Sequence, residues 1–223
     1  MVGATVSTAR KRRQSRNLRD MIITRFYIRD VYPNMTVRLA LEHPTKKGEG
    51  GFLLEDGFLL IDLAKQHVLY NGERVSSDVA DALIHAMKRA GLWDLIHDVS
   101  QRVKKVNEKV QKLTPWIDVR STEPQSGLVV TFISPITLTS TLSVRFRPLK
   151  EGEERLKWEC TFPDSPELCR KLVNEFLEAI EREKELKESF IETLRKLNEL
   201  SKLEEELQRK IEGRRLGDVL RGV

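Results

Sequence analysis

Residues 52–61, with the sequence FLLEDGFLLI, carry the local pattern that decides the expected fold. Two apolar runs flank the pair Asp56-Gly57, and such a pair supplies the positive backbone φ angles of a two-residue type I′ turn. The stretch therefore predicts a β-hairpin. The residues before it, 36–42 (TVRLALE), alternate apolar with polar or small side chains, as a strand does when one face of its sheet is buried.

Two further segments complete an expected antiparallel meander over residues 21–75. Residues 21–32 (MIITRFYIRDVY) are rich in β-branched and aromatic side chains, which favour strands. Residues 67–70 (HVLY) precede Asn71-Gly72, another pair typical of tight turns. We expect about four or five strands in this part of the chain.

A change of hydrophobic period then predicts two helices. Apolar residues recur every three or four positions in residues 79–90 and again in 92–113. Gly91 separates the two runs, and Pro115 follows the second. We therefore expect a pair of helices inserted between strands at residues 76–114.

Strand patterns return in four segments after the insertion. They cover residues 116–120, 128–134, 136–147 and 156–162. Many short strands with turn signals between them are typical of sandwiches and barrels. The sequence thus predicts an α+β chain whose head, residues 20–163, is an antiparallel β-sandwich or barrel, and it argues against a doubly wound α/β fold.

A long helix is expected after the head, at residues 164–212. Asp164 and Pro166 are typical of a helix start, and no glycine or proline follows before Gly213. The apolar positions fit the heptads of a coiled coil, with Glu204 as a misfit. These seam residues are Leu186, Phe190, Leu194, Leu197, Leu200, Leu207 and Ile211. They predict a self-associating stalk, and the alternative is a helix that folds back on its own head.

Positive charge is concentrated at the start of the chain. The net charge of the 223 residues is +5, and the first 19 residues hold six basic side chains and no acid, which leaves −1 for the remainder. The six are Arg10, Lys11, Arg12, Arg13, Arg16 and Arg19. We expect this basic segment, residues 1–19, to be disordered and to bind polyanions such as DNA through phosphate contacts. The alternatives are a nuclear import signal and a solvated terminus with no specific role.

Two other segments are candidates for binding. The helix expected at 92–113 carries a basic face, which serves either as a set of phosphate contacts or as the solvated side of an amphipathic helix. The basic face consists of Arg102, Lys104, Lys105 and Lys109. Residues 213–223 are expected to form a flexible basic tail, in which Leu216, Val219 and Leu220 make a short amphipathic peptide for an unidentified protein partner.

The residue types that carry chemistry form no recognisable constellation in the sequence. His43, His67, His85 and His97 lack the spacing of metal ligands, and no glycine-rich phosphate-binding loop is present in the sequence. We therefore expect no enzyme activity, no metal and no cofactor. Cys160 and Cys169 lie nine positions apart, either bridged or as two buried thiols.

The hydropathy pattern bears on localisation. No apolar run approaches the roughly 18 residues that a membrane span needs, and no apolar stretch follows the N-terminal charges as it does in a secretory signal. We expect an intracellular protein without membrane contact, nuclear if its source is eukaryotic and otherwise cytoplasmic or in the nucleoid.

The order of the expected elements resembles that of the DNA end-joining scaffold superfamily, which includes XLF and PAXX. The centriolar head-and-stalk proteins of the SAS type share that layout. The most similar stretch is 143–190, in which a strand that bears Trp158 leads into the stalk helix. The resemblance implies a non-enzymatic homodimer with a β-sandwich head and a coiled-coil stalk. In XLF and PAXX a basic-aromatic C-terminus docks on Ku, whereas residues 214–223 here contain no aromatic residue.

These observations together lead to one functional expectation and one alternative. The expected function is a homodimeric scaffold in DNA double-strand-break end joining or a related DNA-associated assembly, which contacts DNA non-specifically. The alternative is a structural assembly protein of the centriole or segregation type that does not bind DNA.

Overall fold

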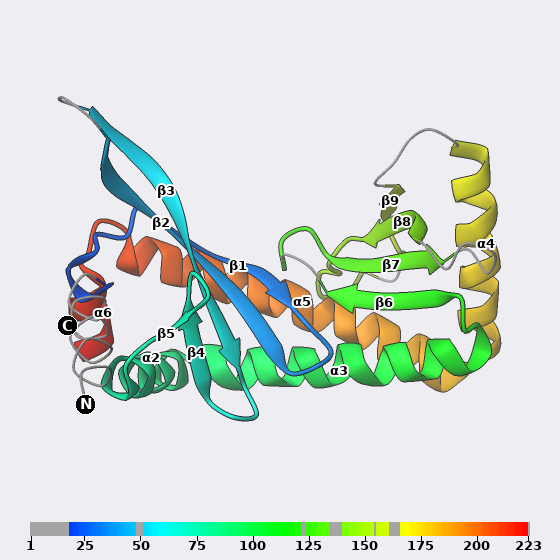
Figure 1. Cartoon of the computed structure of the whole chain (residues 1–223). Helices are drawn as coiled ribbons and strands as arrows, with labels where there is room; N and C mark the ends of the chain where they lie inside the picture. Colours follow the sequence, from blue (N-terminus) through cyan, green and yellow to red (C-terminus); the bar gives the residue numbers. More distant parts are fainter. Residues whose placement is uncertain are drawn as a thin grey trace, which may run out of the picture. The chain divides into compact units, whose positions relative to one another are not determined.

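The computed structural model describes residues 18–47, 51–121, 124–133, 140–153, 155–160 and 166–222 (Figure 1). The chain is α+β and contains two separate antiparallel sheets. It forms two compact units, each assembled from non-contiguous segments. The first unit comprises described residues in 18–29, 36–94 and 203–222, and the second comprises those in 30–35 and 95–202.

The first sheet is a five-stranded meander in which the strands pair in sequence order. Its strands are β1 (Arg25–Val31), β2 (Thr36–Lys47), β3 (Gly51–Asp62), β4 (His67–Tyr70) and β5 (Glu73–Arg74). Asn71 and Gly72 join β4 to β5 with φ angles of 46° and 82°. Both values are positive, as a type I′ turn requires, so the turn expected at this pair is confirmed.

The hairpin expected at Asp56-Gly57 is wrong, because β3 runs through this pair without interruption. Asp56 lies opposite Glu42 and Gly57 opposite Leu41 in a β2–β3 ladder that extends from Thr36 to Lys47. A Cβ atom at Gly57 would lie 2.4 Å from the hydroxyl oxygen of Tyr70. The glycine therefore serves the close approach of the Tyr70 ring to the strand, and the β2–β3 connection at residues 48–50 lies outside the described residues.

Helices cover the inner face of the first sheet. They are α2 (Ser77–Arg89), the end of α5 (Lys184–Ile211) and α6 (Leu216–Arg221), and α2 ends before Gly91, whose φ is 71°, as expected for a helix stop. Apolar side chains from these helices and from the sheet surround a cavity of about 80 Å³. They include Ile23, Leu39, Leu41, Leu59, Leu83, Met87, Leu207, Ile211, Leu216 and Leu220.

The segment after α5 is folded onto the first unit. The backbone N–H of Ile23 donates to the carbonyl of Arg214 at 2.9 Å, and the N–H of Leu216 donates to the carbonyl of Met21 at 2.8 Å. The helix α6 follows, in contact with α2. Residues 213–222, which the sequence suggested as a flexible tail, therefore add a short strand pairing and a helix to this unit.

The second unit contains a four-stranded sheet, also in sequence order. Its strands are β6 (Ile117–Ser121), β7 (Leu128–Ile133), β8 (Ser140–Phe146) and β9 (Trp158–Cys160), and its helices are most of α3 (Leu92–Leu113), α4 (Pro166–Arg182) and most of α5. Phe132 and Phe146 from the sheet meet Phe176 of α4 and Phe190 of α5, with ring centroids 5.2–6.3 Å apart. This aromatic cluster joins both helices to the sheet.

The expected single helix at 164–212 is instead two helices, α4 and α5, that meet at Glu183. Phe176 and Phe190 would lie roughly 21 Å apart along one straight helix, because each residue adds about 1.5 Å. Their ring centroids are only 5.8 Å apart. The shared aromatic cluster therefore brings the two helices together at a bend that no proline or glycine marks. A long coiled-coil helix is accordingly not confirmed.

The two sheets also change the interpretation of the helical pair at 76–114. A sandwich or barrel is not shown, because the strands divide into two sheets that belong to separate units. Each sheet is a meander followed by a shorter helix and then a longer one, α2 and α3 after the first and α4 and α5 after the second. The helical pair α2 and α3 therefore follows the first sheet in the same way that α4 and α5 follow the second sheet. It does not interrupt a single sheet.

Candidate nucleic-acid interface

The basic segment joins the first unit at a buried residue. Arg10, Lys11, Arg12, Arg13 and Arg16 lie outside the described residues. Leu18 is only 4% exposed, and the guanidinium of Arg19 pairs with the carboxylate of Asp78 in the first turn of α2 at 2.8 Å. A Cβ atom at Gly217 of α6 would lie 2.9 Å from the carbonyl oxygen of Arg19. Close packing thus fixes the point at which the basic segment meets the fold.

Much of the basic face of α3 is engaged in ion pairs within the second unit. Arg102 pairs with Asp98 at 2.9 Å and approaches Glu192 of α5 at 4.0 Å. Lys109 pairs with Glu185 of α5 at 3.3 Å. Later residues on α3 meet earlier residues on α5, so the two helices run antiparallel along this face.

Among the described residues, the other two members of the basic face make no ion pair with α5. Lys104 approaches Glu108 of its own helix at 4.0 Å. Lys105 is exposed and makes no ion pair among the residues that the structure describes. As a set, the basic face therefore corresponds more closely to the solvated side of an amphipathic helix than to a free cationic surface.

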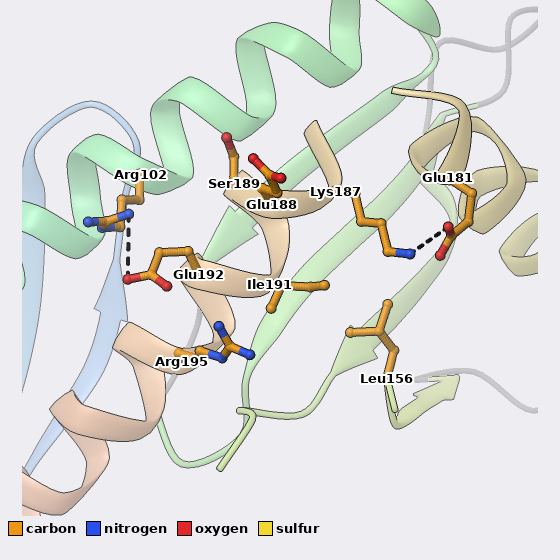
Figure 2. Close-up of a pocket in the computed structure, with 9 residues that line it drawn as sticks. All are labelled: Arg102, Leu156, Glu181, Lys187, Glu188, Ser189, Ile191, Glu192 and Arg195. Atoms are coloured by element: carbon orange, nitrogen blue, oxygen red, sulfur yellow. Dashed lines mark hydrogen bonds and ion pairs between the residues drawn. The ribbon is translucent and has the colours of Figure 1, made fainter. Parts of the chain in front are cut away.

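A hollow of about 760 Å³ opens beside these ion pairs (Figure 2). Three cationic side chains line it together with three carboxylates, so its charge is balanced. The charged lining consists of Arg102, Lys187, Arg195, Glu181, Glu188 and Glu192. Lys187 pairs with Glu181 at 2.6 Å, and Figure 2 shows this pair on the opposite side of the hollow from Arg102 and Glu192. Balanced charge gives the hollow no preference for a phosphate.

The expected dimerisation seam is buried within the single chain. Leu186, Phe190, Leu194, Leu197 and Leu200 are at most 3% exposed. Leu207 and Ile211 line the apolar cavity of the first unit. The structure therefore corresponds to the alternative in which the helix folds back on its own chain, and dimerisation through this seam stays a prediction that requires exchange of these contacts.

The residues expected to form a partner peptide also contact their own chain. Leu216 and Leu220 of α6 are 4% and 6% exposed, and Val219 lines the same apolar cavity. The guanidinium of Arg89 on α2 donates to the carbonyl of Leu220 at 3.0 Å. In this arrangement the apolar side of α6 faces the first unit.

The sequence did not point to the outer face of the first sheet, which is the face opposite the helices. The outer face consists of Arg25, Tyr27 and Arg29 of β1, Arg38, Ala40 and Glu42 of β2, Asp56, Phe58 and Leu60 of β3, Leu69 of β4 and Arg74 of β5. The guanidinium of Arg25 lies 5.0 Å from the ring centroid of Tyr27, and that of Arg38 lies 4.1 Å from the ring of Phe58. The alternation Arg25-x-Tyr27-x-Arg29 was the available signal. It placed cations and a ring on one face of a strand.

Tyr27 is also tied to a neighbouring strand. Its hydroxyl donates to the carboxylate of Asp56 at 3.1 Å. Partial burial, together with the adjacent negative charge of Asp56, raises the pKa of Tyr27 above its ordinary value. The neutral phenol that makes this hydrogen bond is therefore stabilised.

The remaining candidate groups are a histidine and the cysteines. His43 Nε2 lies 3.2 Å from the hydroxyl of Tyr70, and burial raises the pKa of that tyrosine. Within the described residues no cluster of three or more histidine, cysteine or acidic side chains is arranged to hold a metal. Cys160 and Cys169, whose pairing the sequence left open, form a disulfide with Cα atoms 6.6 Å apart.

Comparisons with known protein families, curated proteins and solved structures found no match to this chain. The resemblance to end-joining scaffolds consequently stays a prediction that depends on element order. In the described part of the chain, no helix combines the length and apolar character needed to cross a membrane.

Proposed function

We propose that the protein is a non-enzymatic nucleic-acid-binding adaptor whose basic segment holds DNA by its phosphates. The observation that carries this proposal is the distribution of charge. Residues 1–19 contain six basic side chains and no acid, whereas the remaining residues sum to −1. Such a segment releases counterions from DNA when it binds, and this supplies affinity without sequence preference.

The attachment point supports this role for the basic segment. Leu18 and Arg19 are held against α2 and α6, so a bound phosphate backbone is tethered to a compact unit rather than to a loose chain. On α3, Arg102 and Lys109 already have carboxylate partners, and Lys104 and Lys105 are the members of the basic face with the greater freedom to add phosphate contacts. A DNA-associated assembly, such as one that joins broken ends, is the setting that we propose.

Burial of the seam residues favours a monomer over a dimer formed through α5. A dimer of the expected kind would have to release Phe190 and Leu194, which are 0% exposed in the single chain, from their intrachain contacts. Static light scattering of the full chain measures this directly. A monomer would agree with the intrachain packing, whereas a dimer would require either exchange of these helices between copies or an interface elsewhere on the chain.

The test of DNA binding is fluorescence anisotropy of a labelled duplex over a series of salt concentrations. The full-length variant R10Q/K11Q/R12Q/R13Q/R16Q removes five of the six cations of the basic segment. Since each phosphate contact on duplex DNA contributes about 0.9 to the slope of log affinity against log salt, we expect a slope smaller by up to about 4.5.

The matched control is K104Q/K105Q, which removes two cations from α3 and leaves the basic segment intact. We expect it to reduce the slope far less than the five-residue variant does. The proposal fails if the wild-type chain does not bind duplex or single-stranded DNA even at low salt. It also fails if the five-residue variant binds both as well as the wild type does.

A further inference from the structure

The outer face of the first sheet presents rings and arginines together on a partly exposed surface. Tyr27 and Phe58 are partly exposed, and Leu60 is 37% exposed. Their neighbours along the strands, Phe26 and Leu59, are 7% and 3% exposed, as expected for the opposite, helix-covered face. The sheet thus has an apolar inner face and a mixed aromatic and cationic outer face.

Strand pairing places these side chains in adjacent rows. Arg38 lies opposite Leu60, Leu60 lies opposite Leu69, and Leu69 lies opposite Arg74, so one row crosses β2, β3, β4 and β5. Ala40 lies opposite Phe58 in the next row. Ala40 is 0% exposed, so neighbouring side chains of the outer face cover it.

The aromatic rings are held in position before any ligand binds. The hydroxyl of Tyr27 on β1 reaches Asp56 on β3, and β2 lies between these two strands. The Tyr27 side chain therefore extends across the sheet instead of standing away from it. The guanidinium groups of Arg25 and Arg38 lie 5.0 Å and 4.1 Å from the Tyr27 and Phe58 rings. Each ring thus carries a cation at a distance typical of cation–π contact.

The charge of the outer face complements a polyanion. Four arginines belong to it, against two acids, one of which, Asp56, accepts the hydrogen bond from Tyr27, and a third acid, Asp62, lies on the same face at the end of β3. The arginines are Arg25, Arg29, Arg38 and Arg74. The outer face is therefore net positive, in contrast to the charge-balanced hollow in the second unit.

We propose that the outer face binds single-stranded nucleic acid, with bases stacked on Tyr27 and Phe58 or on the arginine planes above them, and phosphates paired with the arginines. This inference rests on the proposed function, because it takes the nucleic acid to be held first by the basic segment. Single strands suit this surface because their bases are free to stack on protein rings, whereas the bases of a duplex are already stacked on each other. DNA and RNA share this chemistry.

The experiment measures binding of labelled oligo-dT, oligo-U and a DNA duplex at about 0.3 M salt, where screening weakens purely electrostatic contacts. The variants are Y27L and F58L in the full chain, each of which removes a ring and keeps an apolar side chain. The matched control is W116L, because Trp116 is an aromatic residue that is 45% exposed in the second unit. Thermal unfolding verifies that each variant is folded.

We expect Y27L and F58L each to weaken single-strand binding by about 5-fold to 150-fold, the range observed when a base loses its stacking partner. Duplex binding should change less than twofold, and W116L should leave both unchanged. Y27F, which keeps the ring and removes the hydroxyl, should retain most of the single-strand affinity. A difference between oligo-dT and oligo-U would identify which of the two polymers the surface prefers.

Two results would overturn the inference. In the first, Y27L and F58L bind single strands as tightly as the wild type does, while the five-residue variant of the basic segment loses binding. That result would leave the proposed function in place. The other is an equal loss of duplex and single-strand binding in folded Y27L and F58L. If the wild-type chain binds no nucleic acid at low salt, the proposed function and this inference fail together.

Discussion

The carboxylate of Glu204 on α5 accepts a hydrogen bond from the backbone N–H of Ile28 on β1, at 2.7 Å. One turn later, the side chain of Gln208 accepts from the N–H of Phe26 and donates to the carbonyl of Thr24 at 3.3 Å. Since β1 is at the edge of the sheet, these backbone groups have no neighbouring strand on that side among the described residues. The helix supplies the missing partners through two polar side chains, which also protects the edge from pairing with another chain.

Replacing Glu204 by leucine should destabilise the first unit. Glu204 is 2% exposed, so E204L would leave the N–H of Ile28 buried without its acceptor, at a cost of about 1–3 kcal/mol. E204Q keeps an acceptor oxygen and should lose less. Urea unfolding of the two variants measures the difference, and equal stability of E204L and the wild type would contradict the role assigned to this side chain.

Adding a methyl group at Gly57 should be costly because of Tyr70. The added Cβ would lie 2.4 Å from the Tyr70 hydroxyl oxygen and 2.6 Å from a ring carbon. We expect G57A to lose about 1–3 kcal/mol of stability, as overpacked sites do. In a double-mutant cycle Y70A should recover part of that loss. Additive effects of G57A and Y70A would show that the ring is not the obstacle.

The disulfide between Cys160 and Cys169 should stabilise the second unit. It closes a short loop, for which chain entropy gives about 2–3 kcal/mol. We expect the paired variant C160S/C169S to unfold at correspondingly lower urea concentration, and the oxidised wild type to resist alkylation under denaturing conditions. Mass spectrometry of denatured protein that has never been exposed to a reductant tests this. Alkylation at both cysteines would show that the thiols are free.

The antiparallel contact of α3 with α5 predicts a charge-swap effect. K109E places two carboxylates together in place of the Lys109–Glu185 pair and should cost about 0.2–1 kcal/mol, since the pair is exposed. The double variant K109E/E185K restores opposite charges and should recover the loss. Thermal unfolding at low salt measures both, and K109E as stable as the wild type would contradict the pairing.

Tyr27 should ionise at higher pH than an exposed tyrosine. Burial and the charge of Asp56 raise its pKa in the folded state, so the stability that it contributes is fully present below the ordinary tyrosine value of about 10 and is lost as pH rises through the raised pKa. Ultraviolet difference titration of the wild type against Y27F isolates its phenolate signal. D56N should lower the pKa toward its ordinary value, and an unchanged titration in D56N would exclude Asp56 as a cause.

Local patterns predicted the elements that depend on neighbouring residues alone. The spacing of apolar side chains and Gly91 identified α2 and α3, and Asn71-Gly72 identified a tight turn. Asp56-Gly57 has the same turn chemistry but forms strand, because β2 pairs along the whole of β3 and Tyr70 needs the space above the glycine. The dipeptide alone does not determine whether it forms a turn or continues a strand.

The rest of the architecture depends on contacts between distant residues. The bend at Glu183 follows from the aromatic cluster, in which Phe176 and Phe190 contact the same sheet residue, Phe146. In the sequence Glu204 is only a misfit in a heptad, whereas in the fold it is a backbone acceptor. In the same way, the basic segment is visible as a run of charge, but the outer face becomes visible only when strand pairing brings Arg38 and Phe58 together.

The attachment of residues 213–216 to residues 21–23 has a consequence for synthesis of the chain on the ribosome. The described part of the first unit begins at Leu18, yet the acceptor for Ile28 and the backbone partner of Ile23 belong to residues 204–216. The edge of the five-stranded sheet therefore stays incomplete until residues 95–202, which make up most of the second unit, have been translated. We expect nascent chains that end before residue 203 to hold the first unit in a loosely packed form that recruits chaperones.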